Sequence, residues 1–323
     1  MKIPTAIRYL TAAIMSAAIV GAWWYFDEQR EAVTCKYKLI NPTRCENEQR
    51  FANPEFASTQ AAIERLIAER KADGISQVSV AFRDLRNGPS ININAEEPYL
   101  AMSLYKLPIM IRYLKDAEGN PRILDEKITA RLSTQTVNQN LSPDQTLVDG
   151  QEYTILDLIE KMIRYSDNHA RTALVEHYAA PEHNPGYNIV LDTLAELGIV
   201  DAQAYDDVRM VSLRSTASIF RILYNASYLN LEQSQRALQL LVESTYMTGI
   251  GQPIPSGVEV ANKFGYATDA SGSQLHDCGI IYYPQHPYVL CVMTKGADLA
   301  KLERTIADIS RLVYTEVNHR YDN

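Results

Sequence analysis

The chain has 323 residues, of which 46% are hydrophobic, and its formal net charge is −8. This length and apolar content are ample for one large core or for two closely packed subdomains. The acidic balance and the lack of any run rich in Lys or Arg argue against nucleic acid as a partner.

Residues 1–26 have the features of a transmembrane signal-anchor. An uncharged stretch from Tyr9 to Phe26 follows Lys2 and Arg8, and it is just long enough to cross a bilayer. Since the basic side stays in the cytoplasm, we expect the rest of the chain outside the cytoplasm, at the cell membrane. The alternative is a cleaved signal peptide with its cleavage site at Val20–Ala22. We favour the anchor, because a signal peptide rarely ends in a bulky aromatic cluster like the one that closes this stretch.

Residues 27–55 are polar, contain Pro42 and Pro54, and predict an extracytoplasmic stalk. Cys35 and Cys45 lie within this stalk and could close a small loop. We predict a disulfide between them, because four cysteines in an exported chain agree with an oxidising compartment.

The folded domain is predicted to open with an amphipathic helix over 56–71. Apolar residues recur there at helical spacing among charged ones, and Gly74 follows as a stop signal. Alternating apolar residues then predict a strand through 78–82. An Asn87-Gly88 turn and a return strand through 91–93 complete the predicted hairpin.

The apolar spacing is helical from about residue 103 to 245 and then returns to that of strands. We expect helices over 104–113, 155–165, 170–178, 189–197, 216–225 and 231–243. We expect strands over 258–264, 279–283 and 288–294, followed by a last amphipathic helix over 299–317. Strands at both ends with helices between them predict an α/β domain of the α+β type over 56–323. It would hold one antiparallel sheet of about five strands, flanked by helices, plus an all-helical subdomain.

The last two predicted strands carry one cysteine each. If the chain turns near Pro284–His286, Cys278 and Cys291 face each other across a hairpin, and we predict a disulfide between them. Neither C-x-x-C nor H-x-x-x-H spacing occurs, so we expect no metal site and no cofactor.

Ser103 and Lys106 are the first candidate catalytic pair. Residues three apart lie on one face of a helix, and a neutral amine next to a hydroxyl can make it a good nucleophile. Pro108 is tolerated only if the helix starts near Ser103, where backbone N–H groups favour developing negative charge. Apolar neighbours would lower the pKa of the lysine by burial. Taken alone, the pattern also fits a surface helix with a solvated lysine.

Two further motifs follow in order. Ser166-Asp167-Asn168 lies between two helical patterns, where on its own it could simply supply a helix N-cap. Lys263-Phe264-Gly265 falls on a predicted strand. Its lysine could bind a substrate carboxylate as a point charge, and its glycine would let a substrate approach the strand edge closely. The N–H of Tyr266 would pair with that of Ser103 as an oxyanion hole.

Ser-x-x-Lys, then Ser-Asp-Asn, then Lys-x-Gly is a set that resembles the class A β-lactamase family of penicillin-recognising serine hydrolases. The resemblance covers roughly residues 56–320. It implies an acyl-enzyme on Ser103 with Lys106 as the base. It assigns proton transfer to the leaving nitrogen to Ser166, and it assigns Asn168 to holding the substrate amide and the lysine. The implied substrate is a β-lactam or a D-Ala-type peptide.

Two features depart from the family pattern. The family usually has Ser or Thr where this chain has Phe264, so a hydroxyl for carboxylate recognition is lost unless Thr268 substitutes. The stretch 197–212 also lacks the glutamate that activates the deacylating water in class A enzymes. The carboxylates available there are Asp201, Asp206 and Asp207. We therefore expect acylation to survive and hydrolysis of the acyl-enzyme to be slow.

Three functions stay open on this basis. The leading one is a membrane-tethered, β-lactamase-like serine hydrolase that opens β-lactam amides. A peptidoglycan D,D-peptidase or transpeptidase shares every acylation residue and would explain the missing glutamate. A non-turnover penicillin-binding sensor or pseudoenzyme is the third. A glutaminase of the same fold fits less well, because those enzymes work in the cytosol.

Overall fold

The computed structural model describes residues 56–322, apart from 87, 134–144, 181–182, 185–186, 200–209 and 270–271. The predicted anchor over 1–26, the predicted stalk over 27–55 and the predicted Cys35–Cys45 disulfide lie outside these residues. Among the described helices, none is both long enough and apolar enough to cross a membrane.

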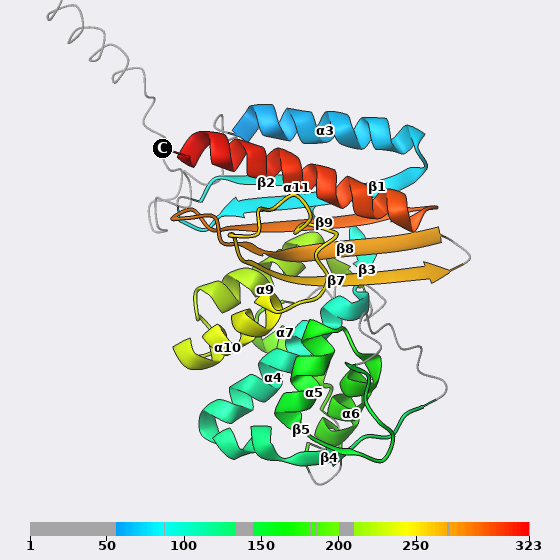
Figure 1. Cartoon of the computed structure of the whole chain (residues 1–323), viewed down its shortest axis with the longest axis vertical. Helices are drawn as coiled ribbons and strands as arrows, with labels where there is room; N and C mark the ends of the chain where they lie inside the picture. The colour runs from blue at the N-terminus through cyan, green and yellow to red at the C-terminus, as the bar shows by residue number, and fades with distance from the viewer. Residues whose placement is uncertain are drawn as a thin grey trace, which may run out of the picture. The chain divides into compact units, whose positions relative to one another are not determined.

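A five-stranded antiparallel sheet forms the centre of the domain (Figure 1). Its strands are β1 (Ile75–Asp84), β2 (Ser90–Ile93), β7 (Val260–Asp269), β8 (Gly272–Ile281) and β9 (Tyr288–Gly296). Their order across the sheet is β2-β1-β9-β8-β7. Because β9 pairs with both β1 and β8, strands from the two ends of the domain join in one sheet, as the sequence predicted. Strand β7 lies at one edge of this sheet.

Helices cover both faces of the sheet. The helices α3 (Ala57–Ala72) and α11 (Leu299–Tyr321) lie together on one face, and α9 (Leu213–Tyr224) packs on the other (Figure 1). Strand β9 is consequently buried without interruption from Tyr288 to Thr294. An antiparallel strand with one wet face would alternate apolar and polar residues. The continuous apolar run therefore reflects the second layer of helices.

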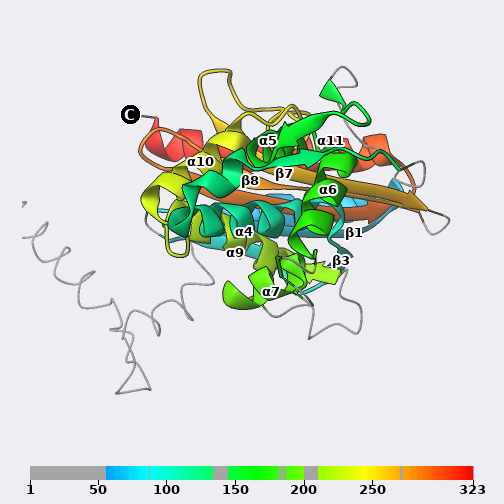
Figure 2. The same cartoon turned by 90° about the horizontal axis from the view of Figure 1, so that it is seen from below.

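The helical part contains α4 (Lys106–Gly119), α5 (Ile155–Arg164), α6 (Asn168–Tyr178), α7 (Ile189–Glu196) and α10 (Leu231–Val242), with the 3₁₀ turns η2 (Met102–Tyr105) and η3 (Pro121–Asp125). Helix α4 is its centre, because it contacts α5, α6, α7 and α10. Figure 2, which views the domain from the helical side, shows α4 and α6 next to each other in front of the sheet. Each helix predicted in this region is present. Helix α4 runs further than the predicted 104–113, since charged residues such as Lys115 and Asp116 end the apolar pattern but not the helix.

Two small ribbons were not predicted. Strand β3 (Pro98–Leu100) pairs with β6 (Met210–Ser212), and β4 (Lys127–Thr129) pairs with β5 (Glu152–Thr154). Three residues are too few to show the alternation that reveals a strand. Polar caps fix the helices that follow two of these strands. Thr154 caps α5 in a reciprocal pair with Asp157, and Ser212 caps α9.

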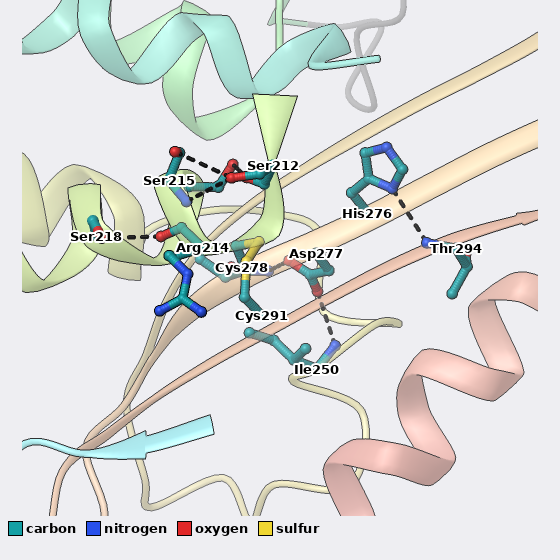
Figure 3. Close-up of a disulfide and its surroundings, with 12 residues drawn as sticks. Ser212, Arg214, Ser215, Ser218, Ile250, His276, Asp277, Cys278, Cys291 and Thr294 are labelled. Carbon is teal, nitrogen blue, oxygen red and sulfur yellow. Dashed lines mark hydrogen bonds between the residues drawn. A yellow bond between two sulfur atoms is a disulfide. The ribbon is translucent and has the colours of Figure 1, made fainter. Parts of the chain in front are cut away.

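The predicted disulfide between Cys278 and Cys291 is present (Figure 3). The two residues are direct partners in the pairing of β8 with β9, with their Cα atoms 4.0 Å apart. Both side chains are fully buried in the core between the sheet and the helical part. The disulfide therefore links two neighbouring strands of the sheet on the face that packs against the helical part.

Candidate active site

Ser103 lies in η2, the turn that leads into α4, and only 6% of the residue is exposed. Met102, directly before it, has a φ of +50° in the left-handed region. Edge strand β7 lies against this turn, because a Cβ at Gly265 would sit 3.1 Å from the backbone N of Ser103. The helical conformation thus begins near Ser103, as predicted. Pro108 falls in the first turn of α4, where its missing N–H costs nothing.

The group that Gly265 allows to come close is a backbone segment of this protein, and not a substrate as the sequence suggested. We expected the glycine to admit a substrate, but the nearest groups to its missing side chain are Ser103 N and, at 3.3 Å, the carbonyl of Ala101. Any side chain at this position would press on the serine turn. The glycine brings the segment that carries Tyr266 close to the turn that carries Ser103.

Lys106 is the first residue of α4, and its side chain is buried at the centre of the cluster. Its Nζ lies 3.1 Å from Ser103 Oγ. It also donates to Ser166 Oγ at 3.0 Å and to the Ser166 carbonyl at 2.7 Å. Asn168 Oδ1 accepts a further bond at 2.7 Å. The structure therefore brings together, around one amine, the four residues of the first two motifs that the sequence singled out.

Burial holds the pKa of Lys106 well below its ordinary value of 10.5, and the positive charges of Lys263 and Arg171 lower it further. Asp167 acts in the opposite direction, but its carboxylate caps α6 by accepting from Ala170 N. A lysine with acceptors but no carboxylate partner is readily neutral. A neutral amine in contact with a hydroxyl is the arrangement that a general base requires.

Ser166 joins the two lysines of the site. It has a φ of +58° in the segment between α5 and α6, and this left-handed conformation lets its carbonyl and its hydroxyl both meet Lys106. The same hydroxyl accepts a bond from Lys263 Nζ at 3.1 Å. A hydroxyl held between two amines is well placed to pass a proton.

Lys263 is fully buried on edge strand β7. Besides Ser166, its Nζ donates to the carbonyl of Phe264 at 3.2 Å and lies 4.4 Å from the centroid of the Phe264 ring. Burial lowers the pKa of Lys263 to about 7, against the opposing pull of Asp277. Near neutral pH this lysine is therefore poised between its charged and neutral forms.

Asp277 is a buried carboxylate that sequence analysis missed. It lies on β8 and accepts hydrogen bonds from Ile250 N at 2.8 Å (Figure 3) and from Asn262 Nδ2 at 3.0 Å. Burial raises its pKa to about 7. The available signal was a lone acidic residue in this strand, directly before Cys278. Its proximity to Lys263 is a product of strand register, which the sequence does not display.

Phe264 fills the position where the family usually has a hydroxyl. Its ring is buried and stacks on Tyr246 at a centroid distance of 4.1 Å, with Tyr266 at 6.3 Å on the same strand. Thr268 does not replace that hydroxyl. It lies four residues further along β7, or about 13 Å by strand geometry, and its Oγ1 pairs with Ser273 Oγ. Lys263 is thus the charged group on this side of the site.

No carboxylate in the described part of the chain forms a hydrogen bond or ion pair with Ser103, Lys106, Ser166 or Lys263. The candidates for activating a deacylating water, Asp201, Asp206 and Asp207, lie outside the described residues. The described residues also contain no group of His, Cys, Asp or Glu side chains able to hold a metal ion. Within the described residues, the groups that meet at the cluster are hydroxyls, amines, an amide and backbone carbonyls.

The contacts among Ser103, Lys106, Ser166, Asn168 and Lys263 join the motifs on which the class A resemblance rests, and the comparison with family models agrees. A model described as "Beta-lactamase enzyme family" matches residues 58–317. The chain belongs to this family.

Individual relatives are distant. Beta-lactamase CTX-M-8 from Citrobacter amalonaticus is 24% identical over 147 residues, and the aligned part spans 46% of this chain and 49% of that enzyme. A solved beta-lactamase from Sphaerobacter thermophilus has a TM-score of 0.68 at 23% identity, covering 80% of this chain and 97% of the other. The acyl-enzyme complex of the PBP-A L158E mutant with penicillin G has a TM-score of 0.67 at 21% identity, covering 81% and 97%. At these identities the solved structures establish a shared fold.

Proposed function

We propose that this chain is a serine hydrolase that opens β-lactam amides through an acyl-enzyme on Ser103. The observation that carries the proposal is the buried Lys106 amine, 3.1 Å from Ser103 Oγ and without a carboxylate partner among the described residues. Membership of the beta-lactamase family favours a β-lactam over the peptidase and sensor alternatives.

The acylation steps follow from the contacts around the two amines. Lys106 takes the proton of Ser103, whose Oγ forms a bond to the carbonyl carbon of the substrate. The resulting oxyanion is stabilised by the N–H groups of Ser103 and Tyr266. As the C–N bond breaks, Ser166 gives its proton to the leaving nitrogen and recovers one from Lys106, which it contacts at 3.0 Å.

Two residues on either side of this cluster, Lys263 and Asn168, bind different parts of the substrate in this scheme. Lys263 attracts the carboxylate beside the leaving nitrogen as a point charge. Asn168 binds the amide of the acyl side chain and holds Lys106 through its Oδ1 at 2.7 Å. Hydrolysis of the ester releases the acid, and we expect this step to be slow, because the stretch 197–212 contains no glutamate.

A time course of intact-protein mass after exposure to benzylpenicillin tests the proposal. We expect a one-to-one adduct on wild-type protein, decaying over minutes with slow nitrocefin turnover, and no adduct on Ser103→Ala. An adduct that persists on Ser103→Ala would remove Ser103 from the scheme. Release of D-alanine from a muropeptide would support the peptidase instead, and a permanent adduct with neither activity would support the sensor.

We also propose that the catalytic domain is tethered to a membrane and lies outside the cytoplasm. The uncharged stretch from Tyr9 to Phe26 after two basic residues supports the anchor, and the Cys278–Cys291 disulfide suits an oxidising compartment. Fractionation and protease treatment of intact spheroplasts test this. Digestion of the domain from outside and retention of the uncut chain in washed membranes are expected; a protected or freely released chain contradicts it.

A further inference from the structure

Arg171 is a cation that neither the class A motifs nor the scheme above uses. It lies on α6, three residues after Asn168, so it shares that residue's side of the helix. Helix α6 packs against α4, the helix that carries Lys106. The charge of Arg171 reaches the site, since it lowers the pKa of Lys106.

The guanidinium of Arg171 has no carboxylate partner within ion-pairing distance among the residues that the structure describes. Its one side-chain hydrogen bond goes to the hydroxyl of the adjacent Thr172 at 3.2 Å. Burial lowers the pKa of Arg171, and only the more distant charge of Glu176 opposes this. A half-buried guanidinium normally gains a carboxylate or phosphate partner. Among the described residues, this charge therefore has no ion-pairing partner.

Arg171 follows the residue that stands furthest from Lys263 along the hydrogen-bonded chain of the site. One chain of hydrogen bonds runs from Lys263 Nζ to Ser166 Oγ, to Lys106 Nζ and to Asn168 Oδ1. Arg171 follows Asn168 by about one helical turn. Under the proposed function, Lys263 faces the leaving-nitrogen side of the substrate and Asn168 faces its acyl side, so Arg171 lies beyond the acyl amide.

We propose that Arg171 binds an anionic group on the acyl side of the scissile amide, so that preferred substrates carry a negative charge on each side of the bond that breaks. This inference rests on the proposed function. It makes Arg171 a specificity-determining residue, and the substrate class it names is an amide with a carboxylate or sulfonate on its acyl side chain. The carboxylates of Asp167 and Asp277 are engaged by backbone N–H groups and form no ion pair with Arg171.

Three penicillins with the same phenyl-bearing acyl group provide the test, because they differ in one substituent. Carbenicillin carries a carboxylate there, benzylpenicillin a hydrogen and ampicillin an ammonium. We expect the second-order rate constant for adduct formation on the full-length protein to fall in that order, with carbenicillin about tenfold faster than ampicillin. In Arg171→Gln the order should collapse, whereas Arg171→Lys should keep most of it. Sulbenicillin, with a sulfonate, shows whether any anion suffices or a carboxylate is required.

Arg221→Gln is the matched control, since Arg221 is also half-buried but lies on α9. It should keep the wild-type order. Equal rates for the three penicillins on wild-type protein would overturn the inference while the proposed function stands, and this arm needs no variant to fold. An equal slowing of all three in Arg171→Gln, with a shifted pH profile, would show that Arg171 acts only through Lys106 and would also overturn it. No adduct with any penicillin would overturn the proposed function and this inference together.

Discussion

Lys106 and Lys263 are two buried amines that touch the same hydroxyl, yet their surroundings differ. Lys106 on α4 has several oxygen acceptors, two other cations near it and a pKa far below the ordinary value. Lys263 on β7 has fewer acceptors, an aromatic ring against its Nζ and the buried Asp277 behind it. The helical side of the site thus favours a neutral amine, and the sheet side favours one that can still be charged.

Under the proposed function, this difference separates the lysine that takes a proton from the lysine that binds the substrate carboxylate. A base must be neutral before it can take a proton, whereas a group that attracts a carboxylate must be charged. Both lysines have pKa values lowered by burial, but other cations lower the pKa of Lys106 further, whereas Asp277 opposes the lowering at Lys263. Among the described residues, the hydroxyl of Ser166 is the group that both amines contact.

The largest effect is expected from removing the amine of Lys106, the lysine that its surroundings keep neutral. Lys106→Met should slow acylation about a thousandfold, because general-base assistance contributes about 10² to 10⁴ in rate. Lys106→Arg should be equally slow, since a guanidinium stays protonated. The measurement is the rate of adduct formation with a fixed penicillin.

The exposed Lys127 offers a matched control, and Lys127→Met should acylate at the wild-type rate. If Lys106→Arg retained substantial acylation, the two lysines would not differ in the way that their surroundings indicate. Thermal melting of each variant separates lost chemistry from lost fold.

Removing the charged amine should have a smaller and more selective effect. Lys263→Gln should weaken capture of benzylpenicillin about thirtyfold, because a charge-assisted hydrogen bond is worth about 1.5–3 kcal/mol. The methyl ester of the same penicillin has no carboxylate and should lose much less. Equal losses for the acid and the ester, measured as kcat/KM, would assign Lys263 to the chemistry and not to capture.

The architecture was largely predictable because its signal is periodic. The central helices, the hairpin at the start and the strands at the end of the domain all have apolar residues at the spacing of their element. The three-residue strands β3 to β6 were not predictable, since they are too short for any period. The end of α4 was missed because its last turns are charged and held by pairs such as Arg112–Asp116.

The site was predictable as a set of residues and not as an electrostatic arrangement. Motif order brought Ser103, Lys106, Ser166 and Lys263 forward, and the structure places them within a single hydrogen-bonded chain. Asp277 and Arg171 had no motif to mark them. Their effects on the two lysines depend on strand register and helix packing, which arise only when distant segments fold together.

The pH dependence should distinguish the two lysines within one protein. The pKa of Lys263 is lowered to about 7, so its charge is present below pH 7 and lost as the pH rises through 7. The value of kcat/KM for benzylpenicillin, which reports ionisations of the free protein, should therefore fall about tenfold from pH 6 to pH 8.5. The methyl ester should not follow this fall, because it does not need the charge. A parallel fall for both would mean that the titrating group serves the reaction itself.

The smallest effect is expected where the two halves of the site meet. In Gly265→Ala the new Cβ would lie 3.1 Å from Ser103 N and 3.3 Å from the Ala101 carbonyl, so β7 and the serine turn must separate by a few tenths of an ångström. Acylation should slow by about tenfold or less, since the oxyanion donors on the two segments lose their shared position. Benzylpenicillin and its methyl ester should be slowed alike, in contrast to Lys263→Gln. Gly257→Ala is the control, because a Cβ there meets nothing within 4 Å. A loss confined to the acid would show that the spacing of β7 governs capture, and the division between the two lysines would then have to be redrawn.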